Sequence, residues 1–488
     1  MNDLSFAADL RAALAAADYT YDAVAALLGE TAMAALGRNE TTPGLLATGG
    51  GSALETLTRL WPLQTTVPAS AAEAALPGLV DRLCNAGILE RSISEVAARV
   101  DVRPYGDGER ELWIVSDLTP GLDGGPQGVS ADYVLGLSPA ATSLAELTVR
   151  RPAATALDLG TGCGVQALHL AAHVDRVVAT DVNARALWLT RLNAEINGLS
   201  DSIEVVDGSF FEPVREERFD LIVTNPPFVI SPATGERLVY RDSGLPGDRV
   251  VEHIVREARA HLTDGGLCQI LANWAIVEGQ PWDERIASWC DGLDVWVVQR
   301  ERVDPATYVE MWLKDAGQHP ATGGDAADYR RRYETWLSWL RDEGIEAIGF
   351  GWINLRRTDA EPQVTLQEWP YDVAQPIGPE IGAHFERIDW LRANADLGSS
   401  YLRLRPDVIQ ETSGQPGAED PEAVLLRQQL GLRRARKVST AEAAFVGACD
   451  GDLSVGQLNA AVEQVVGQRV SESVIRELLL EGYLESTR

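Results

Sequence analysis

The sequence predicts an α/β fold in its central part, with a largely parallel sheet and helices connecting the strands. A short apolar strand, Ala156-Leu157-Asp158-Leu159, runs directly into the glycine-rich turn Gly160-Thr161-Gly162-Cys163-Gly164, and a helical pattern begins at Val165. A second apolar strand, Leu221-Ile222-Val223, stops at Asn225-Pro226-Pro227-Phe228, because neither proline has an N–H to donate. Ligands of open α/β sheets bind outside the carboxyl ends of the strands, so both stops are candidate site positions.

Strands and helices alternate through the rest of this region. The strand after the glycine turn, residues 176–180, ends in Asp181, and the next strand, 202–206, ends in Asp207-Gly208. Carboxylates at such strand ends suit the hydroxyls of a ribose in nucleotide-binding sheets. Helices are predicted at 184–196 and 329–340, and further strands at 267–272, 293–298 and 347–355.

The stretch Asn225-Pro226-Pro227-Phe228 suits a planar amino group. The Asn225 amide oxygen and the Pro226 carbonyl are two acceptors for the two hydrogens of one NH2 group. Two acceptors would hold that nitrogen and help to free its lone pair for attack. Phe228 would stack on the flat group that carries the nitrogen. A plain Pro-Pro loop is the alternative that these residues alone leave open.

Composition narrows the class of protein. The 488 residues suffice for about three domains, and the net charge of −30 disfavours a dedicated nucleic-acid binder because it repels phosphate. No apolar run reaches transmembrane length, and the start Met1-Asn2-Asp3-Leu4 lacks the basic region of a signal peptide, so we predict a cytoplasmic protein with no membrane partner. The five cysteines and six histidines are scattered, so we predict neither disulfides nor a metal site.

Residues 1–118 are predicted to form a helical, winged-helix-like N-terminal domain. A helix is expected at 77–86, followed by a hairpin with strands at 98–103 and 112–115 around the turn Tyr105-Gly106-Asp107-Gly108. Winged helices often bind DNA, but the acidic charge favours covering a substrate or pairing two chains as a homodimer. Duplex DNA is therefore not an expected partner.

Two further segments are predicted after an α/β domain of residues 128–375. Residues 376–420 carry scattered proline and glycine and are expected to form a rim and linker, and residues 421–488 a small winged-helix-like module. The basic cluster Arg433-Arg434-Ala435-Arg436-Lys437 is expected to be a solvated helix face, with contact to phosphate or an acidic partner as the alternative.

The central domain resembles class I S-adenosylmethionine-dependent methyltransferases. The residues that carry the resemblance are Asp-Leu-Gly-Thr-Gly-Cys-Gly at 158–164 and Asn-Pro-Pro-Phe-Val-Ile at 225–230. Within that class, Asn-Pro-Pro-Phe resembles the branch that methylates amide or exocyclic amino nitrogens, including the release-factor glutamine methyltransferases and the "small" ribosomal RNA guanine-N2 enzymes. The resemblance covers roughly a third of the chain. It implies a Rossmann-like, seven-stranded sheet flanked by the two winged-helix-like domains.

The resemblance also implies S-adenosyl-L-methionine as the cofactor and a set of site residues. Asp158 and the glycine turn would line its methionine part, Asp181 would hold the ribose, and Asp207 would lie beside the adenine. The implied cofactor-binding residues are Asp158, Gly160, Thr161, Gly162, Cys163, Gly164, Asp181, Val182, Asp207, Gly208 and Asn225, and the implied catalytic residues are Asn225, Pro226, Pro227 and Phe228. A dinucleotide-dependent dehydrogenase is disfavoured, because the glycine spacing departs from G-x-G-x-x-G.

Several methyl acceptors remain open. A protein glutamine or other amide suits the acidic balance. A nucleobase amine in ribosomal or transfer RNA would need the 433–437 cluster, and a small secondary metabolite would suit a winged-helix cap. A non-catalytic, cofactor-binding scaffold is disfavoured because the glycine turn and Asn225 are intact. The loop 240–248 is expected either to line the substrate rim or to be an ordinary helix start with Asp248 as N-cap.

Overall fold

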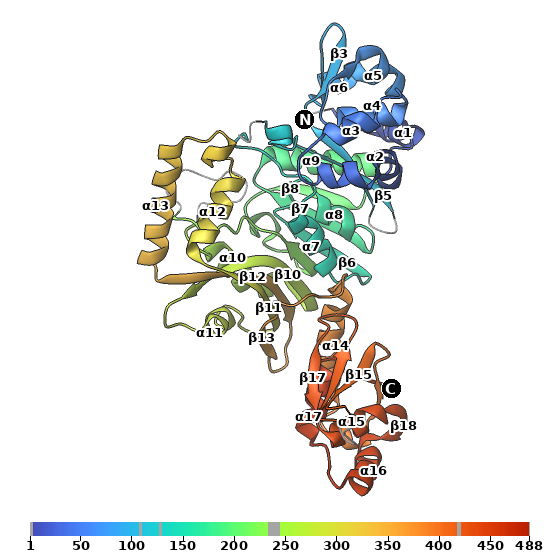
Figure 1. The fold of residues 1–488 in the computed structure, drawn as a ribbon, viewed down its shortest axis with the longest axis vertical. Helices are drawn as coiled ribbons and strands as arrows, with labels where there is room; N and C mark the ends of the chain where they lie inside the picture. Colours follow the sequence, from blue (N-terminus) through green and yellow to red (C-terminus); the bar gives the residue numbers. More distant parts are fainter. Residues whose placement is uncertain (1–2, 107–109, 126–128, 233–244, 417–420, 488) are drawn as a thin grey trace. The chain divides into compact units, whose positions relative to one another are not determined.

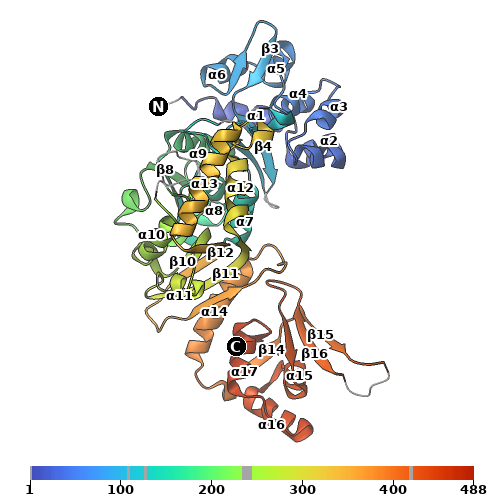
Figure 2. The same ribbon diagram turned by 60° about the vertical axis from the view of Figure 1, so that its left-hand side comes forward.

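The computed structural model describes residues 3–106, 110–125, 129–232, 245–416 and 421–487 (Figure 1; Figure 2). The chain divides into two compact units. The larger unit comprises Met1–Ala145 and Arg151–Gln367, and the smaller unit comprises Glu146–Arg150 and Glu368–Arg488. None of the helices within the described ranges is long and apolar enough to cross a membrane.

The larger unit is centred on an eight-stranded sheet in the order β13-β11-β12-β10-β9-β6-β7-β8. Neighbouring strands from β10 to β8 in that order are parallel, whereas β12 pairs antiparallel with both β10 and β11. The strands are β6 (Ala153–Leu159), β7 (Val174–Asp181), β8 (Ile203–Asp207), β9 (Phe219–Thr224), β10 (Leu262–Val277), β11 (Leu293–Val303), β12 (Ile345–Arg357) and β13 (Val364–Glu368). Strands β6 to β12 confirm the predicted Rossmann-like, seven-stranded sheet, and β13 is an eighth strand that the sequence analysis missed.

Helices connect the strands, as the alternation predicted. They are α7 (Pro139–Leu147), α8 (Val165–Leu170), α9 (Ala184–Asn197), α10 (Arg249–Ala258) and α11 (Trp282–Ala287). Apolar residues of α10 recur at helical spacing, and Val251 and Ile254 share one buried core with Ile222 of β9 and Cys268 of β10. Burial of these side chains fixes the middle of the sheet, from which the site residues emerge.

A helical hairpin lies between β11 and β12 and forms a second core. Its helices, α12 (Pro305–Asp315) and α13 (Ala326–Asp342), pack side by side (Figure 1; Figure 2). This core also contains Ile348 of β12 together with Val229 and Ile230, which follow β9. The hairpin therefore packs against the chain just beyond the Asn-Pro-Pro-Phe stretch.

The N-terminal part of the larger unit contains a winged-helix arrangement. The helices α1 (Ala7–Ala16), α2 (Tyr21–Leu36) and α3 (Thr42–Ala47) come first. They are followed by α4 (Ala53–Leu60), β1 (Val67–Pro68), α5 (Ala69–Ala75), α6 (Val80–Asn85), β2 (Leu89–Arg91) and β3 (Glu95–Ala98). The three strands pair in the order β1-β3-β2, so the hairpin β2–β3 is the wing.

The hairpin predicted from the sequence forms, but it is not the wing. Strands β4 (Asp101–Gly106) and β5 (Glu111–Ser116) make a separate two-stranded ribbon, and its turn, residues 107–109, falls outside the described residues. The true wing has no glycine or asparagine at its turn. The tip of the wing carries Ile93, which is 102% exposed. Isoleucine is not a typical turn residue, so the sequence does not indicate a turn at this point.

The smaller unit contains more regular structure than the sequence analysis expected. Its elements are α14 (Gly378–Ala393), β14 (Tyr401–Leu404), β15 (Val408–Ser413), β16 (Ala423–Gln428), β17 (Ala435–Val438), α15 (Thr440–Gly447), β18 (Asp450–Ser454), α16 (Val455–Val466), α17 (Glu472–Leu480) and β19 (Leu484–Ser486). Residues 376–420, expected to form a rim and linker, instead contain α14, β14 and β15. Pro379 lies in the first turn of α14, where proline is well tolerated, so the cluster of proline and glycine starts a helix.

The basic cluster at 433–437 forms a strand and the turn before it, so the prediction of a helix face is wrong. Residues from Ala435 onward form β17 and pair with β16. The Arg436 guanidinium pairs with Glu477 at 2.7 Å and with Glu481 at 3.0 Å. The Arg434 guanidinium lies 5.1 Å from the ring centre of Trp369. Arg434 and Arg436 of the cluster thus interact with residues of the smaller unit itself.

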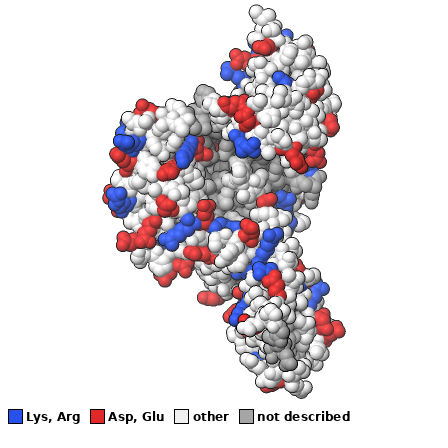
Figure 3. All heavy atoms as spheres, in the orientation of Figure 1, with Lys and Arg blue, Asp and Glu red and all other residues white. Residues whose placement is uncertain are grey.

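We expect the full chain not to shift a DNA duplex in a mobility assay at moderate salt. The net charge of −30 repels phosphate, and acidic side chains lie among the basic ones across the face drawn in Figure 3. Tight duplex binding that weakens steeply as salt is added would contradict this expectation.

Candidate functional site

The predicted site residues meet at the carboxyl edge of the sheet. Leu159, at the end of β6, lies opposite Thr180 of β7 and Thr224 of β9. Asp181, the last residue of β7, lies opposite Asp207, the last residue of β8. Because Gly160 and Asn225 directly follow Leu159 and Thr224, the glycine turn, both carboxylates and the Asn-Pro-Pro-Phe stretch begin along one edge.

The glycine turn needs its glycines and is held by Asp158. Gly160, Gly162 and Gly164 have φ values of 75°, 58° and 86°, a region that side chains with a Cβ atom disfavour. The buried Asp158 carboxylate accepts from the Thr161 hydroxyl at 2.6 Å and from the Ala167 amide at 3.0 Å. Burial raises the pKa of Asp158 to about 7. Asp158 therefore ties the turn to the first turn of α8.

Asp181 is placed to accept further hydrogen bonds. One carboxylate oxygen accepts from the Gly162 amide at 3.0 Å, and the other accepts from the Asn183 amide at 2.9 Å. Each oxygen keeps a further lone pair for an incoming hydroxyl. Burial raises the pKa of Asp181. The next residue, Val182, is 69% exposed and offers an apolar surface beside the carboxylate.

Asp207 and Gly208 complete the row of strand ends. Asp207 is exposed, and the Gly208 amide donates to the Asp181 carbonyl at 3.1 Å. Gly208 has a φ of 155°, and Pro213 crowds the position where a Cβ atom would lie. Glycine is therefore required at this position, where the chain turns directly after Asp207.

Helix α9 supports the site through residues that the sequence analysis missed. The Thr190 hydroxyl donates to the Gly162 carbonyl at 3.0 Å, and the Asn193 amide nitrogen donates to the Cys163 carbonyl at 2.7 Å. Asn193 and Asn197, one helical turn apart, also bind the backbone of β5 in the N-terminal ribbon. Both the glycine turn and the ribbon are thus held by one helix.

Cys163 has no nucleophilic role in this arrangement. Its side chain is buried, and burial raises the pKa of the thiol to about 12. A thiol in that state stays protonated at neutral pH. Its position in the turn instead supplies the carbonyl that Asn193 binds.

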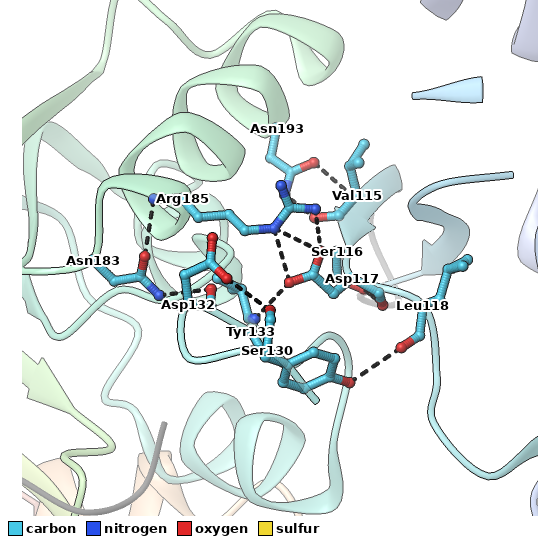
Figure 4. A network of polar contacts seen from close by, with 11 residues as sticks. Val115, Ser116, Asp117, Leu118, Ser130, Asp132, Tyr133, Asn183, Arg185 and Asn193 are labelled. Carbon is cyan, nitrogen blue, oxygen red and sulfur yellow. Dashed lines mark hydrogen bonds and ion pairs between the residues drawn. The ribbon is translucent and has the colours of Figure 1, made fainter. Parts of the chain in front are cut away.

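A polar network surrounds the start of α9, the helix that follows Asp181 in the chain (Figure 4). Arg185 of α9 forms a two-point ion pair with Asp117, which follows β5. Asp117 also accepts from the Val134 amide at 2.7 Å, and the Asn183 side chain donates to the Asp132 carbonyl at 2.9 Å. The network fixes residues 130–134 and the end of β5 against the start of α9.

The Asn-Pro-Pro-Phe stretch leaves the sheet with an unpaired acceptor. The Thr224 hydroxyl donates to the Leu159 carbonyl at 2.7 Å and so fixes the end of β9. The side-chain oxygen of Asn225 is buried and has no hydrogen-bond partner among the described residues. A buried acceptor without a donor costs free energy. An incoming N–H group would satisfy it.

Phe228 lies half-buried beside the helical hairpin. Its ring centre is 6.3 Å from that of Trp312, and the ring planes make an angle of 68°, an edge-to-face contact. Pro226 is buried and Pro227 is half-buried. The predicted catalytic residues therefore form one compact segment between the sheet edge and α12.

Asp248 does not cap α10 with its side chain, contrary to the expected alternative. Its carboxylate pairs with both terminal nitrogens of Arg285, at 2.6 and 2.7 Å, and accepts from the Ala275 amide at 2.8 Å. Ala275 lies in the part of β10 that extends beyond the pairing of β10 with β9. The Asp248 carboxylate therefore accepts the hydrogen bond of a backbone amide that β9 does not reach. The expected rim loop begins at Tyr240, and its residues up to 244 lie outside the described residues.

Two parts of the chain match known protein families. Residues 137–280 match the methyltransferase small domain, and residues 16–99 match a domain of unknown function (DUF7059). The first match spans β6 to β10 and contains every predicted site residue. The second spans the winged-helix arrangement from α2 to β3.

The chain is also similar to glutamine methyltransferases. It is 35% identical over 150 residues to the ribosomal protein uL3 glutamine methyltransferase of Bradyrhizobium diazoefficiens, a match that covers 28% of this chain and 47% of that protein. It is 34% identical over 119 residues to the release factor glutamine methyltransferase of Aquifex aeolicus, covering 22% of this chain and 42% of the relative. The chain thus spans less than half the length of these relatives. A solved methyltransferase from Pyrococcus furiosus aligns with 36% of this chain and 83% of its own, at 21% identity and a TM-score of 0.25.

Proposed function

We propose that the central part of this chain, which matches the methyltransferase small domain, transfers a methyl group from S-adenosyl-L-methionine to the side-chain amide nitrogen of a protein glutamine. The buried oxygen of Asn225, for which the described residues provide no hydrogen-bond donor, carries this proposal. It lies where β9 ends, at the same edge as the glycine turn and Asp181. The NH2 group of a glutamine amide can donate the hydrogen bond that this oxygen would accept.

The residues at the sheet edge fit the parts of S-adenosyl-L-methionine. The free lone pairs of Asp181 suit two ribose hydroxyls, and the exposed Val182 and Asp207 suit the adenine. The glycine turn lets the backbone come close to the methionine part. Bound there, the cofactor supplies a methyl group already activated by its sulfonium.

Asn225 and its neighbours orient the acceptor nitrogen. The Asn225 oxygen and the Pro226 carbonyl each accept one hydrogen of the NH2 group, which turns the nitrogen lone pair away from both acceptors. Phe228 packs on the flat amide. A reaction with an activated methyl group gains most of its rate from alignment and exclusion of water, so no strong base is required.

A protein acceptor agrees with the charge of the chain. At −30 the protein repels RNA, and Arg434 and Arg436 of the basic cluster already interact within the smaller unit. The named relatives act on a ribosomal protein and on release factors. These two kinds of protein are therefore the first acceptors to test.

The test uses the full chain, S-adenosyl-L-methionine labelled in its methyl group, purified release factors and purified ribosomal protein uL3. Fractionated lysate from a strain lacking the gene is assayed in parallel. We expect label in protein. Label that enters only RNA or small molecules would reject the protein glutamine assignment.

Phe228→Ala should raise the KM for the acceptor about tenfold while cofactor affinity stays unchanged. The ring packs on the acceptor both before and during transfer, and losing an aromatic contact of this kind costs about 0.5–1.5 kcal/mol beyond area burial. Phe228→Tyr keeps the ring and should restore a KM near that of the wild type. Steady-state kinetics on both variants measure this. An unchanged KM in Phe228→Ala would remove Phe228 from the acceptor site.

A further inference from the structure

We propose that helix α12 positions the Asn-Pro-Pro-Phe stretch for methyl transfer, with Tyr308 and Trp312 as its positioning residues and Asn273 orienting Tyr308. This inference rests on the proposed function, because the position matters only if Asn225 and Phe228 hold the acceptor. It adds a part of the chain outside the residues matched by the methyltransferase small domain, since α12 begins at Pro305.

The backbone after the stretch is held by one hydroxyl group. The Ile230 amide donates to the Tyr308 hydroxyl oxygen at 2.8 Å, and the Asn273 side-chain nitrogen donates to the same oxygen at 3.0 Å. All three residues are 0% exposed. Water therefore cannot replace the hydroxyl group if it is removed, and the Ile230 amide would lose its partner.

Asn273 comes from the part of β10 that extends past β9. The pairing of β10 with β9 ends at Ile270 and Thr224, whereas β10 continues along β12 to Val277. At this point the chain after β9 turns away from the sheet. The hydrogen bonds through Tyr308 thus replace strand pairing as the link between the departing chain and β10.

The same helix also holds the aromatic ring of the stretch. The Trp312 ring makes edge-to-face contacts with Phe228, at 6.3 Å and 68°, and with Tyr308, at 6.0 Å and 71°. Tyr308 and Trp312 are four residues apart, so their side chains lie on one face of α12. Residues 228–230 are therefore held at both ends, through a ring and through a backbone amide.

The start of α12 is itself fixed. The Asp304 carboxylate accepts from the Thr307 hydroxyl at 2.6 Å and caps the helix by accepting from the Ala306 and Thr307 amides, at 3.0 and 3.1 Å. The bond from the Thr307 hydroxyl, followed by the amide bonds, lowers the pKa of Asp304. Tyr308 lies in the next position. A small displacement of residues 228–230 would move Asn225 and Phe228 out of line with the methyl group, and misplacement of about 1 Å can cost a hundredfold in rate.

Hydrogen exchange tests the anchoring without any acceptor. The measurement is the rate of amide hydrogen exchange in the peptide covering residues 225–232, followed by mass spectrometry on the full chain. We expect this rate to be at least tenfold higher in Tyr308→Phe than in the wild type. Tyr333→Phe is the matched control. Its hydroxyl donates to Glu310 at 3.1 Å within the same helical hairpin, so its loss should leave that peptide unchanged.

Kinetics test the positioning. We expect Tyr308→Phe to lower kcat about tenfold, with cofactor affinity unchanged by calorimetry and Tyr333→Phe at the wild-type kcat. Wild-type exchange in Tyr308→Phe, or faster exchange with an unchanged kcat, would overturn the positioning role. A wild-type chain that methylates no glutamine would reject the proposed function instead, and the exchange result would still decide whether Tyr308 anchors the stretch.

Discussion

Asn225→Ala should lower turnover by about a hundredfold or more. The affinity for S-adenosyl-L-methionine should stay almost unchanged, because the Asn225 side chain would make little contact with the adenosine or methionine part of the cofactor. The substitution removes one preorganised acceptor from the reacting nitrogen, and losses of that kind cost a factor of about 100–1,000 in kcat. The Asn225 oxygen has no partner among the described residues, so its removal breaks no bond that the structure shows. Steady-state kinetics and calorimetry measure the two quantities separately.

Thermal unfolding provides the control for this variant. Because the removed oxygen is buried and has no donor within the described part of the chain, Asn225→Ala should unfold at the wild-type temperature or slightly above it. Asn225→Asp keeps an acceptor in the same place and should retain part of the activity, although its charge would also attract the sulfonium. Turnover near wild type in Asn225→Ala would reduce the stretch to a structural strand stop.

Asp181→Ala should weaken binding of S-adenosyl-L-methionine by roughly 2–4 kcal/mol, or about 30- to 1,000-fold. The carboxylate would lose two charge-assisted hydrogen bonds from the ribose, and the Gly162 and Asn183 amides would lose their acceptor. Calorimetry on the full chain measures the change.

Asp132→Ala is the matched control for this prediction. Its exposed carboxylate is near the site, but the network around Asn183 uses its backbone carbonyl, which the substitution keeps. Cofactor affinity should therefore stay near wild type in Asp132→Ala. Unchanged affinity in Asp181→Ala would overturn the ribose assignment, and binding of a nicotinamide cofactor instead would overturn the class.

The sheet and the row of strand ends could be predicted because their signals are local. A strand that meets Gly160 or Pro226 must end there, whatever surrounds it. The parallel sheet then brings those ends to one edge, where the structure places Asp181 opposite Asp207. The roles assigned to the individual site residues remain predictions, and the variants described above test them.

The supporting residues could not be predicted because their partners are far away in the sequence. Asp248 looks like a helix cap until Arg285 is placed beside it, and Asn193 looks like a helix surface residue until β5 lies against it. The role of Tyr308 likewise becomes clear only when the structure places its hydroxyl group beside the Ile230 amide. The wing at β2–β3 was missed for a different reason, since Ile93 at its tip is an apolar residue left exposed.

The identity of the methylated atom tests the proposed chemistry most directly. The labelled acceptor protein is purified after reaction with the full chain and hydrolysed completely in acid. A methyl group on a glutamine amide nitrogen leaves as labelled methylamine when the amide is cleaved, and we expect this product together with unlabelled glutamate. Label released as methanol, or retained on an amino acid or a nucleobase, would contradict transfer to a glutamine amide nitrogen.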